Sequence, residues 1–184
     1  MNIVKDYLTK LQETISELSV EQIEENINLI QSAHDNGKQV FLIGNGGSAA
    51  MASHFACDLQ KGLKMASGKR LRAIALTDSI PIISAWANDT SYNNIFSEQL
   101  DSLADSGDLL IAISGSGNSP NIINAVEKAN EMGLITVGWS GFDGGKLAKV
   151  VKHPLIINSD NMQRIEDVHV ILAHVIFFSM VSKY

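Results

Sequence analysis

Cysteine is nearly absent from the chain, which has 184 residues and Cys57 as its single cysteine. A lone cysteine has no partner within the chain, so no disulfide framework exists and a reducing compartment, by default the cytoplasm, is expected. Basic residues are also few, since 14 Lys and Arg stand against 20 Asp and Glu and give a formal net charge of −6. This charge opposes nonspecific binding to nucleic acid or to an anionic membrane surface. We therefore expect no nucleic-acid partner and no membrane partner.

The sequence also lacks an apolar run long enough to cross a membrane. Its most apolar stretch, residues 168–181, contains His169 and His174 and is shorter than the ~20 residues that a spanning helix needs. We interpret it as part of a buried helix. The first residues mix charges into their apolar positions, so no secretory signal is expected. With 45% apolar and only 18% charged residues, the chain can bury a core, and its length fits a single domain over residues 1–184.

Helical periodicity opens the chain. Apolar residues recur with helical spacing over residues 4–18 and again over residues 23–30. Ser19 precedes Gln22 by three positions, a capping-box pattern that starts the second helix, and Gly37 is placed to end it. The sequence therefore predicts a helical extension over residues 1–37, followed by a sheet core and a carboxy-terminal helix over residues 38–184.

Short apolar runs alternate with helical segments in the rest of the chain. Residues 40–43 are followed by GNGGS and a helical stretch over residues 49–59, and residues 109–113 are followed by SGSGNS and a helix that begins at Pro120. Three further runs, at residues 73–76, 135–138 and 155–157, have the character of strands. This pattern predicts an α/β fold with three layers, in which helices cover both faces of a doubly wound, five-stranded parallel sheet.

Two polar loops follow strands of this predicted sheet, where ligands bind in open parallel sheets. The first, GNGGS at residues 44–48, lets the backbone approach a ligand closely, and Ser48 is placed to cap the next helix. It has neither the GxGxxG spacing of dinucleotide folds nor the lysine of a P-loop, which disfavours nicotinamide and nucleoside triphosphate ligands. In the second loop, Ser114, Ser116 and Ser119 alternate with glycines directly before a helix, a combination that suits one phosphate group. The alternative is a glycine-rich turn in which Ser119 only caps the helix.

Ionisable residues gather on two predicted helices. His54 and Asp58 lie four apart and share one helix face, so they are two metal ligands, a base with its orienting partner, or a simple surface pair. On the last helix, Glu166, His169 and His174 interrupt an apolar pattern. For His169 we favour a buried core histidine. Cys57 points about 100° away from Asp58 around the helix, and we expect a small buried residue there.

Asn88 and Asp89 form a further polar pair, which follows Trp86. They are placed either to reach sugar hydroxyls or simply to terminate a helix, and local chemistry leaves both alternatives open.

Five segments together resemble the phosphosugar isomerase (SIS) fold and, within it, the phosphoheptose isomerases. They are FLIGNGGSAAMASHFACDL, WANDTSYNNIFSEQL, GDLLIAISGSGNSPNII, FDGGKLA and QRIEDVHVILAHVI. The resemblance implies a homotetramer with substrate pockets between subunits, and aldose–ketose isomerisation of a phosphorylated sugar, by default sedoheptulose 7-phosphate, through an enediol.

The resemblance also implies roles for individual residues. Asp58 and His174 match the catalytic acid and base, and the zinc-binding group would be His54, Asp58, Glu166 and His174. The substrate-binding residues would be Asn45, Gly46, Gly47, Ser48, Asn88, Asp89, Ser114, Gly115, Ser116 and Ser119.

The sequence departs from the heptose enzymes at two of these positions. Asp58 stands where they usually have glutamate, and Glu166 where they usually have glutamine. Both replacements keep metal-ligand chemistry, although Asp58 is one methylene shorter. The alternative function is a noncatalytic phosphosugar-binding protein, similar to the initiator-associating branch of the fold. The joint presence of four ionisable residues favours the enzyme, and the basic run at residues 61–72 is interpreted as a solvated loop.

Overall fold

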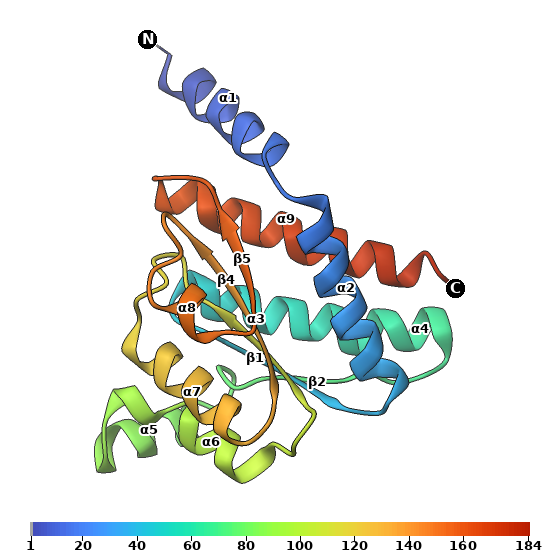
Figure 1. The fold of residues 1–184 in the computed structure, drawn as a ribbon, viewed down its shortest axis with the longest axis vertical. Helices are drawn as coiled ribbons and strands as arrows, with labels where there is room; N and C mark the ends of the chain where they lie inside the picture. The colour runs from blue at the N-terminus through green and yellow to red at the C-terminus, as the bar shows by residue number, and fades with distance from the viewer. Residues whose placement is uncertain (1) are drawn as a thin grey trace.

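A five-stranded parallel sheet forms the centre of the molecule (Figure 1). The structure is a computed structural model that describes residues 2–184. The strands are β1 (Gln39–Gly44), β2 (Arg72–Ala75), β3 (Leu109–Ile113), β4 (Ile135–Gly141) and β5 (His153–Ile157). They lie in the order β2-β1-β3-β4-β5, and every neighbouring pair runs parallel. The predicted sheet is thus confirmed.

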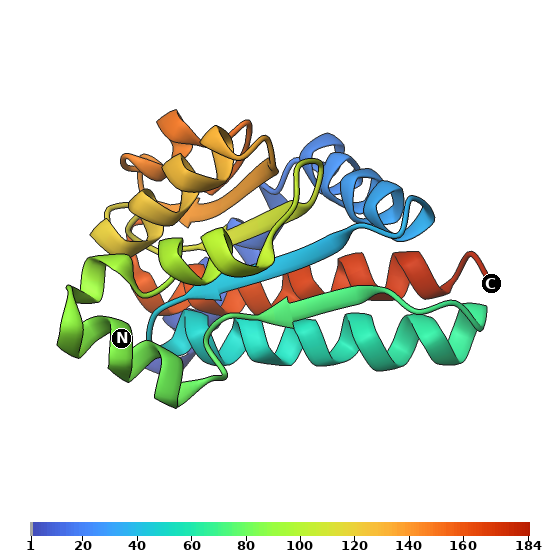
Figure 2. The same cartoon turned by 90° about the horizontal axis from the view of Figure 1, so that it is seen from below.

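Helices cover both faces of the sheet. They are α1 (Ile3–Ser16), α2 (Val20–Asp35), α3 (Gly47–Cys57), α4 (Leu63–Ser67), α5 (Ile80–Asp89), α6 (Ser97–Leu103), α7 (Pro120–Glu131), α8 (Leu147–Val150) and α9 (Met162–Val181), with a short 3₁₀ turn over Tyr92–Asn94. Figures 1 and 2 show α2, α3 and α9 on one side of the sheet and α6, α7 and α8 on the other. This arrangement confirms the three predicted layers.

The central strands β1 and β3 are largely apolar because both of their faces are buried. Val40 and Leu42 of β1 join the core cluster beneath α2, α3 and α9. Phe41 and Ile43, which point to the opposite face, join the cluster beneath α6, α7 and α8. All four side chains are at most 1% exposed. Burial on both faces explains why the strands form continuous apolar runs instead of alternating patterns.

The amino-terminal helices form as their sequence predicts. The hydroxyl of Ser19 accepts a hydrogen bond from the backbone N–H of Gln22 and caps α2, and Gly37 follows this helix with a φ of +65°. Helix α1 projects from the body of the molecule (Figure 1). It is attached to α9 through Tyr7, whose hydroxyl donates to Asp167 Oδ2 at 2.6 Å. This hydrogen bond raises the pKa of Tyr7 above its ordinary value.

Helix α3 continues directly into a five-residue π-helical turn, Asp58–Gly62, and then into α4. A π turn widens the helix by one residue, and such turns are frequent at functional sites. Gly62 faces the ring of Phe177 on α9 so closely that an added Cβ would lie 2.2 Å from two ring carbons. The basic run therefore begins within this helix, and the prediction of a loop throughout residues 61–72 is wrong.

The sequence did not predict α5, α6 and α8. Helix α5 buries none of its residues fully. Its sequence therefore lacks a distinct apolar face, which is the pattern that predicts a helix. Among the residues that the structure describes, no helix has the length and apolar character needed to cross a membrane.

Candidate active site

The glycine loop connects β1 to α3. Gly44 passes so close to Ser48 that an added Cβ would meet the Ser48 backbone at 2.6 Å, and Gly46 has a φ of +54°. Gly46 occupies the N-cap position of α3. Ser48 is buried in the first turn of the helix, so the prediction that Ser48 caps it is wrong.

Asn45 in this loop is bonded to the start of α7. Its amide nitrogen donates to Asn121 Oδ1 at 2.8 Å, and the Asn121 amide nitrogen donates to Asn45 Oδ1 at 2.9 Å. The hydroxyl of Tyr92 donates to the same Asn45 oxygen at 3.1 Å. Neither Asn121 nor Tyr92 was predicted as a site residue, although both lie in segments that carry the family resemblance.

The serine loop follows β3 and ends at the N-terminus of α7. The Ser114 hydroxyl is buried and donates to Ser119 Oγ at 3.4 Å. Ser119 occupies the N-cap position of α7, yet its side chain makes no capping hydrogen bond. This argues against the alternative in which Ser119 is only a helix cap. Within residues 2–184, the backbone N–H groups of Gly115, Ser116 and Ser119 have no acceptor. Free N–H groups, hydroxyls and a helix N-terminus together can bind an anion.

The ionisable residues of α3 and α9 meet side by side. His54 Nε2 lies 2.9 Å from His174 Nε2 and 3.3 Å from Asp58 Oδ2, and one ligand atom of each residue lies within 4.8 Å of the others. Asp58 is the first residue of the π turn. The His54–Asp58 pair is on the surface, as its spacing allowed. His174, 120 residues further along the chain, adds a third ionisable side chain to this pair.

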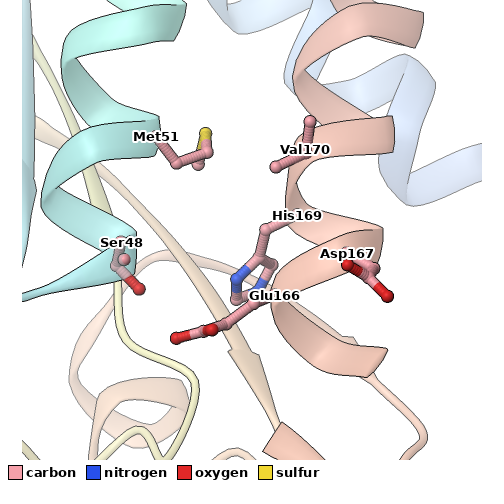
Figure 3. A pocket seen from close by; sticks show the side chains of 7 residues that line it. Ser48, Met51, Glu166, Asp167, His169 and Val170 are labelled. Carbon is pink, nitrogen blue, oxygen red and sulfur yellow. The ribbon is translucent and has the colours of Figure 1, made fainter. Parts of the chain in front are cut away.

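Glu166 does not join this group. It lies eight residues before His174 on the same helix, a separation of about 12 Å along the axis. Instead it lines a cavity of about 220 Å³ between the start of α3 and the start of α9 (Figure 3). Its carboxylate lies next to Gly47, where an added Cβ would be 3.2 Å from Oε1. Within one chain, the predicted four-residue metal group therefore consists of three residues.

His169 lies beneath the same cavity and next to the ring of Trp139, with the two ring centroids 6.2 Å apart. The side chain is 1% exposed, which confirms the prediction of a buried histidine. Burial lowers its pKa to about 4, so the ring is neutral at pH 7. Neither ring nitrogen has a hydrogen-bond partner in the described part of the chain.

The structure also shows where three other predicted residues lie. Asn88 and Asp89 form the last turn of α5, are exposed, and hydrogen-bond to each other at 2.7 Å. This placement agrees with the helix-terminating alternative.

Cys57 is exposed, so the prediction of a buried cysteine is wrong. The reason is that it lies on the side of the helix that faces away from the sheet.

Comparisons with known proteins agree with this architecture. The profile of the SIS domain family matches residues 5–141, which is well over half of the chain, so the chain belongs to this family. The phosphoheptose isomerase of Aliarcobacter butzleri is 40% identical over 177 residues, which cover 95% of this chain and 93% of the relative. That of Clostridium acetobutylicum is 40% identical over 157 residues, covering 85% and 80%.

Solved structures give the same result. The phosphoheptose isomerase from Neisseria gonorrhoeae superimposes with a TM-score of 0.89 and 33% identity, over 97% of each chain. That from Francisella tularensis has a TM-score of 0.89 and 28% identity, over 100% of this chain and 98% of the other. Within the SIS family, the chain therefore belongs to the phosphoheptose isomerases.

Proposed function

We propose that this protein interconverts sedoheptulose 7-phosphate and a heptose 7-phosphate by aldose–ketose isomerisation through an enediol. Membership of the phosphoheptose isomerases gives the reaction class. The observation that carries the proposal is the group of His54, Asp58 and His174, because a protein that only bound a phosphosugar would have no need of converging acid–base side chains.

The serine loop holds the phosphate group in this proposal. The free N–H groups of Gly115, Ser116 and Ser119 and the hydroxyls of the loop donate to phosphate oxygens. The dipole of α7, a 12-residue helix, takes the place of a lysine or arginine. Asn45 and Ser48, on the neighbouring glycine loop, then border the sugar chain.

Asp58 and His174 transfer the protons. One of them removes the proton from the carbon next to the carbonyl group, and the other returns a proton to the adjacent carbon, with the roles exchanged in the reverse direction. Positioned proton-transfer groups of this kind accelerate reactions by about 100- to 10,000-fold. His54 lies within hydrogen-bond distance of both and orients them.

The same three residues fit a zinc ion. Two imidazole nitrogens and one carboxylate oxygen are a donor set that catalytic zinc sites use together with one open position. His54, Asp58 and His174 would hold the ion, since one donor atom of each lies within 4.8 Å of the other two. When bound there, zinc would polarise the carbonyl oxygen of the sugar as a Lewis acid.

Glu166 becomes a fourth ligand only if a second subunit supplies it, because it cannot reach the group around His174 of its own chain. This geometry supports a homotetramer with active sites between subunits. The exposed apolar residues Ile3 and Val4 on α1 and Phe178 on α9 offer surfaces for such an association. Sedimentation at four times the 19.9 kDa chain mass is the expected result.

The partners and the location of the protein remain predictions from its composition. The net charge of −6 supports the absence of nucleic-acid and anionic-membrane partners, and the single cysteine supports a cytoplasmic location.

Turnover of sedoheptulose 7-phosphate by the purified protein, with and without added zinc, tests the proposal. We expect conversion to the aldose phosphate that is lost in Asp58→Asn and His174→Ala. His153→Ala is the matched control, because His153 pairs with Glu25 at 2.8 Å and takes no part in the site. Binding of the phosphosugar without turnover in the wild-type protein would contradict the isomerase and support the noncatalytic binding protein.

A further inference from the structure

The serine loop is held on one side by the loop between β4 and α8, residues 142–146. Three successive carbonyl oxygens of the serine loop accept hydrogen bonds. Gly115 O accepts from Gly141 N, the last residue of β4, at 2.9 Å, and Gly117 O accepts from Leu147 N, the first residue of α8, at 2.9 Å. Ser116 O accepts from the side-chain amide of Asn118 at 2.8 Å.

Asn118 also connects the two loops directly. Its side-chain oxygen accepts from the backbone N–H of Lys146 at 3.2 Å, while its side-chain nitrogen donates to Ser116 O. The carboxamide is thus engaged at both ends by the protein backbone. These two bonds give Asn118 a role in the support of the loop.

Glycines on both sides allow the two loops to approach so closely. A Cβ on Gly117 would lie 2.2 Å from Gly144 O, and Gly117 has a φ of +64°. A Cβ on Gly145 would lie 2.7 Å from each of three atoms, namely Asn118 Nδ2, Gly117 O and Ser116 O. Side chains at these positions would separate the loops.

The electrostatic consequence concerns the phosphate. A carbonyl oxygen that faced the phosphate would repel it, whereas a backbone N–H attracts it. The carbonyls of residues 115–117 are engaged by donors, and the N–H groups of Gly115, Ser116 and Ser119 have no acceptor in the part of the chain that the structure describes. The serine loop therefore has free N–H donors and engaged carbonyl oxygens before any ligand binds.

We propose that Asn118 is a positioning residue, which holds the serine loop in its phosphate-binding conformation by bridging Ser116 O and Lys146 N. The proposal rests on the proposed function for the identity of the anion. Phosphate binding that is common to the substrate and the transition state lowers KM without changing kcat. Loss of the bridge should therefore raise KM and leave kcat unchanged.

Asn118→Ala tests the proposal, with Asn130→Ala as the matched control. Asn130 also bridges two groups, since it donates to Val150 O at 2.8 Å and accepts from Thr136 Oγ1 at 2.9 Å, but it lies at the other end of α7. The readouts are the Kd of inorganic phosphate by calorimetry, the KM and kcat for sedoheptulose 7-phosphate, and Tm. We expect Asn118→Ala to raise both the Kd and KM about tenfold with kcat within about twofold, and Asn130→Ala to lower Tm with both constants unchanged.

Gly145→Ala provides a second perturbation, which keeps the Asn118 residue but crowds its side-chain nitrogen and the serine-loop carbonyls. It pushes a methyl group between the loops and should raise the same two constants. Wild-type values of Kd and KM in Asn118→Ala would overturn the proposal, and so would an equal rise in Asn130→Ala. If the wild-type protein bound phosphate tightly but did not turn over the sugar, the isomerase would fail, while the phosphate Kd would still decide the role of Asn118. If it bound neither phosphate nor phosphosugar, both proposals would fail.

Discussion

The carboxamides of Asn45 and Asn121 exchange two hydrogen bonds, of 2.8 and 2.9 Å, although the residues are 76 positions apart in the chain. Asn45 belongs to the glycine loop after β1, and Asn121 belongs to the first turn of α7, directly after the serine loop. Because β1 and β3 are neighbours in the sheet, the two loops emerge side by side. The amide pair fixes the relative position of the two loops that carry the predicted sugar and phosphate sites.

Replacement of Asn121 by alanine should therefore weaken substrate binding. The change removes both hydrogen bonds between Asn45 and Asn121, so the Asn45 carboxamide keeps only the bond from Tyr92 and the glycine loop is held less firmly. We expect a rise in KM of about tenfold, which corresponds to about 1.4 kcal/mol. Asn124→Ala on the same helix is the control, because Asn124 makes one exposed hydrogen bond to Asn93 O at 3.3 Å. In a double-mutant cycle with Asn45→Ala, strict additivity would show that the pair is not coupled.

The length of the side chain at position 58 gives a second prediction. Asp58→Glu keeps the carboxylate at the start of the π turn, and we expect it to retain turnover within about tenfold. Asp58→Asn keeps the size but removes the charge and the proton acceptor, and its kcat should fall by about 100- to 10,000-fold. Steady-state kinetics together with zinc content by mass spectrometry checks both. Equal kcat values for Asp58→Asn and the wild-type protein would remove Asp58 from the proton transfer.

A methyl group at Gly62 should disturb the π turn that follows Asp58. An added Cβ would lie 2.2 Å from Cε2 and Cζ of Phe177, so the ring or the turn must move. We expect Gly62→Ala to lower the free energy of unfolding by about 1–3 kcal/mol, as overpacking does. Urea denaturation measures this change. Adding Phe177→Leu should restore part of the loss, and an unchanged loss in the double variant would show that the ring is not its cause.

Burial of His169 predicts a dependence of stability on pH. The pKa is about 4 in the folded protein and 6.5 in the unfolded chain, so between these values the unfolded chain binds more protons. The contribution of neutral His169 to the free energy of unfolding is fully present above about pH 6.5. It declines as the pH falls and is lost by about pH 4. The two pKa values differ by about 2.5, which corresponds to roughly 3 kcal/mol in the free energy of unfolding.

Urea denaturation between pH 4 and pH 8 measures this dependence. His169→Gln has no group that titrates in this range, and its stability should decline less steeply with falling pH. Parallel curves for the two proteins would exclude His169 as the source.

Local sequence determined the sheet and most of the helices. Continuous apolar runs such as residues 109–113 can be buried on both faces only in a covered parallel sheet. The capping residue Ser19 and the terminating Gly37 set the limits of α2 through local backbone chemistry. The serine loop was predicted as a phosphate site for the same reason, since hydroxyls and glycines directly before a helix form a local pattern that suits an anion.

Only the tertiary structure decided which of these residues meet. The spacing of His54 and Asp58 left a surface pair as an alternative, and the packing of α3 along α9 was needed to bring His174 to them. The separation of Glu166 from His174, in contrast, follows from helix geometry, because residues eight apart on one helix lie about 12 Å apart along its axis. Asn121 and Asn118 lie in a segment that carries the family resemblance, but the sequence assigned them no role, since an asparagine carboxamide acquires its role only from the distant backbone or side chain that it bonds.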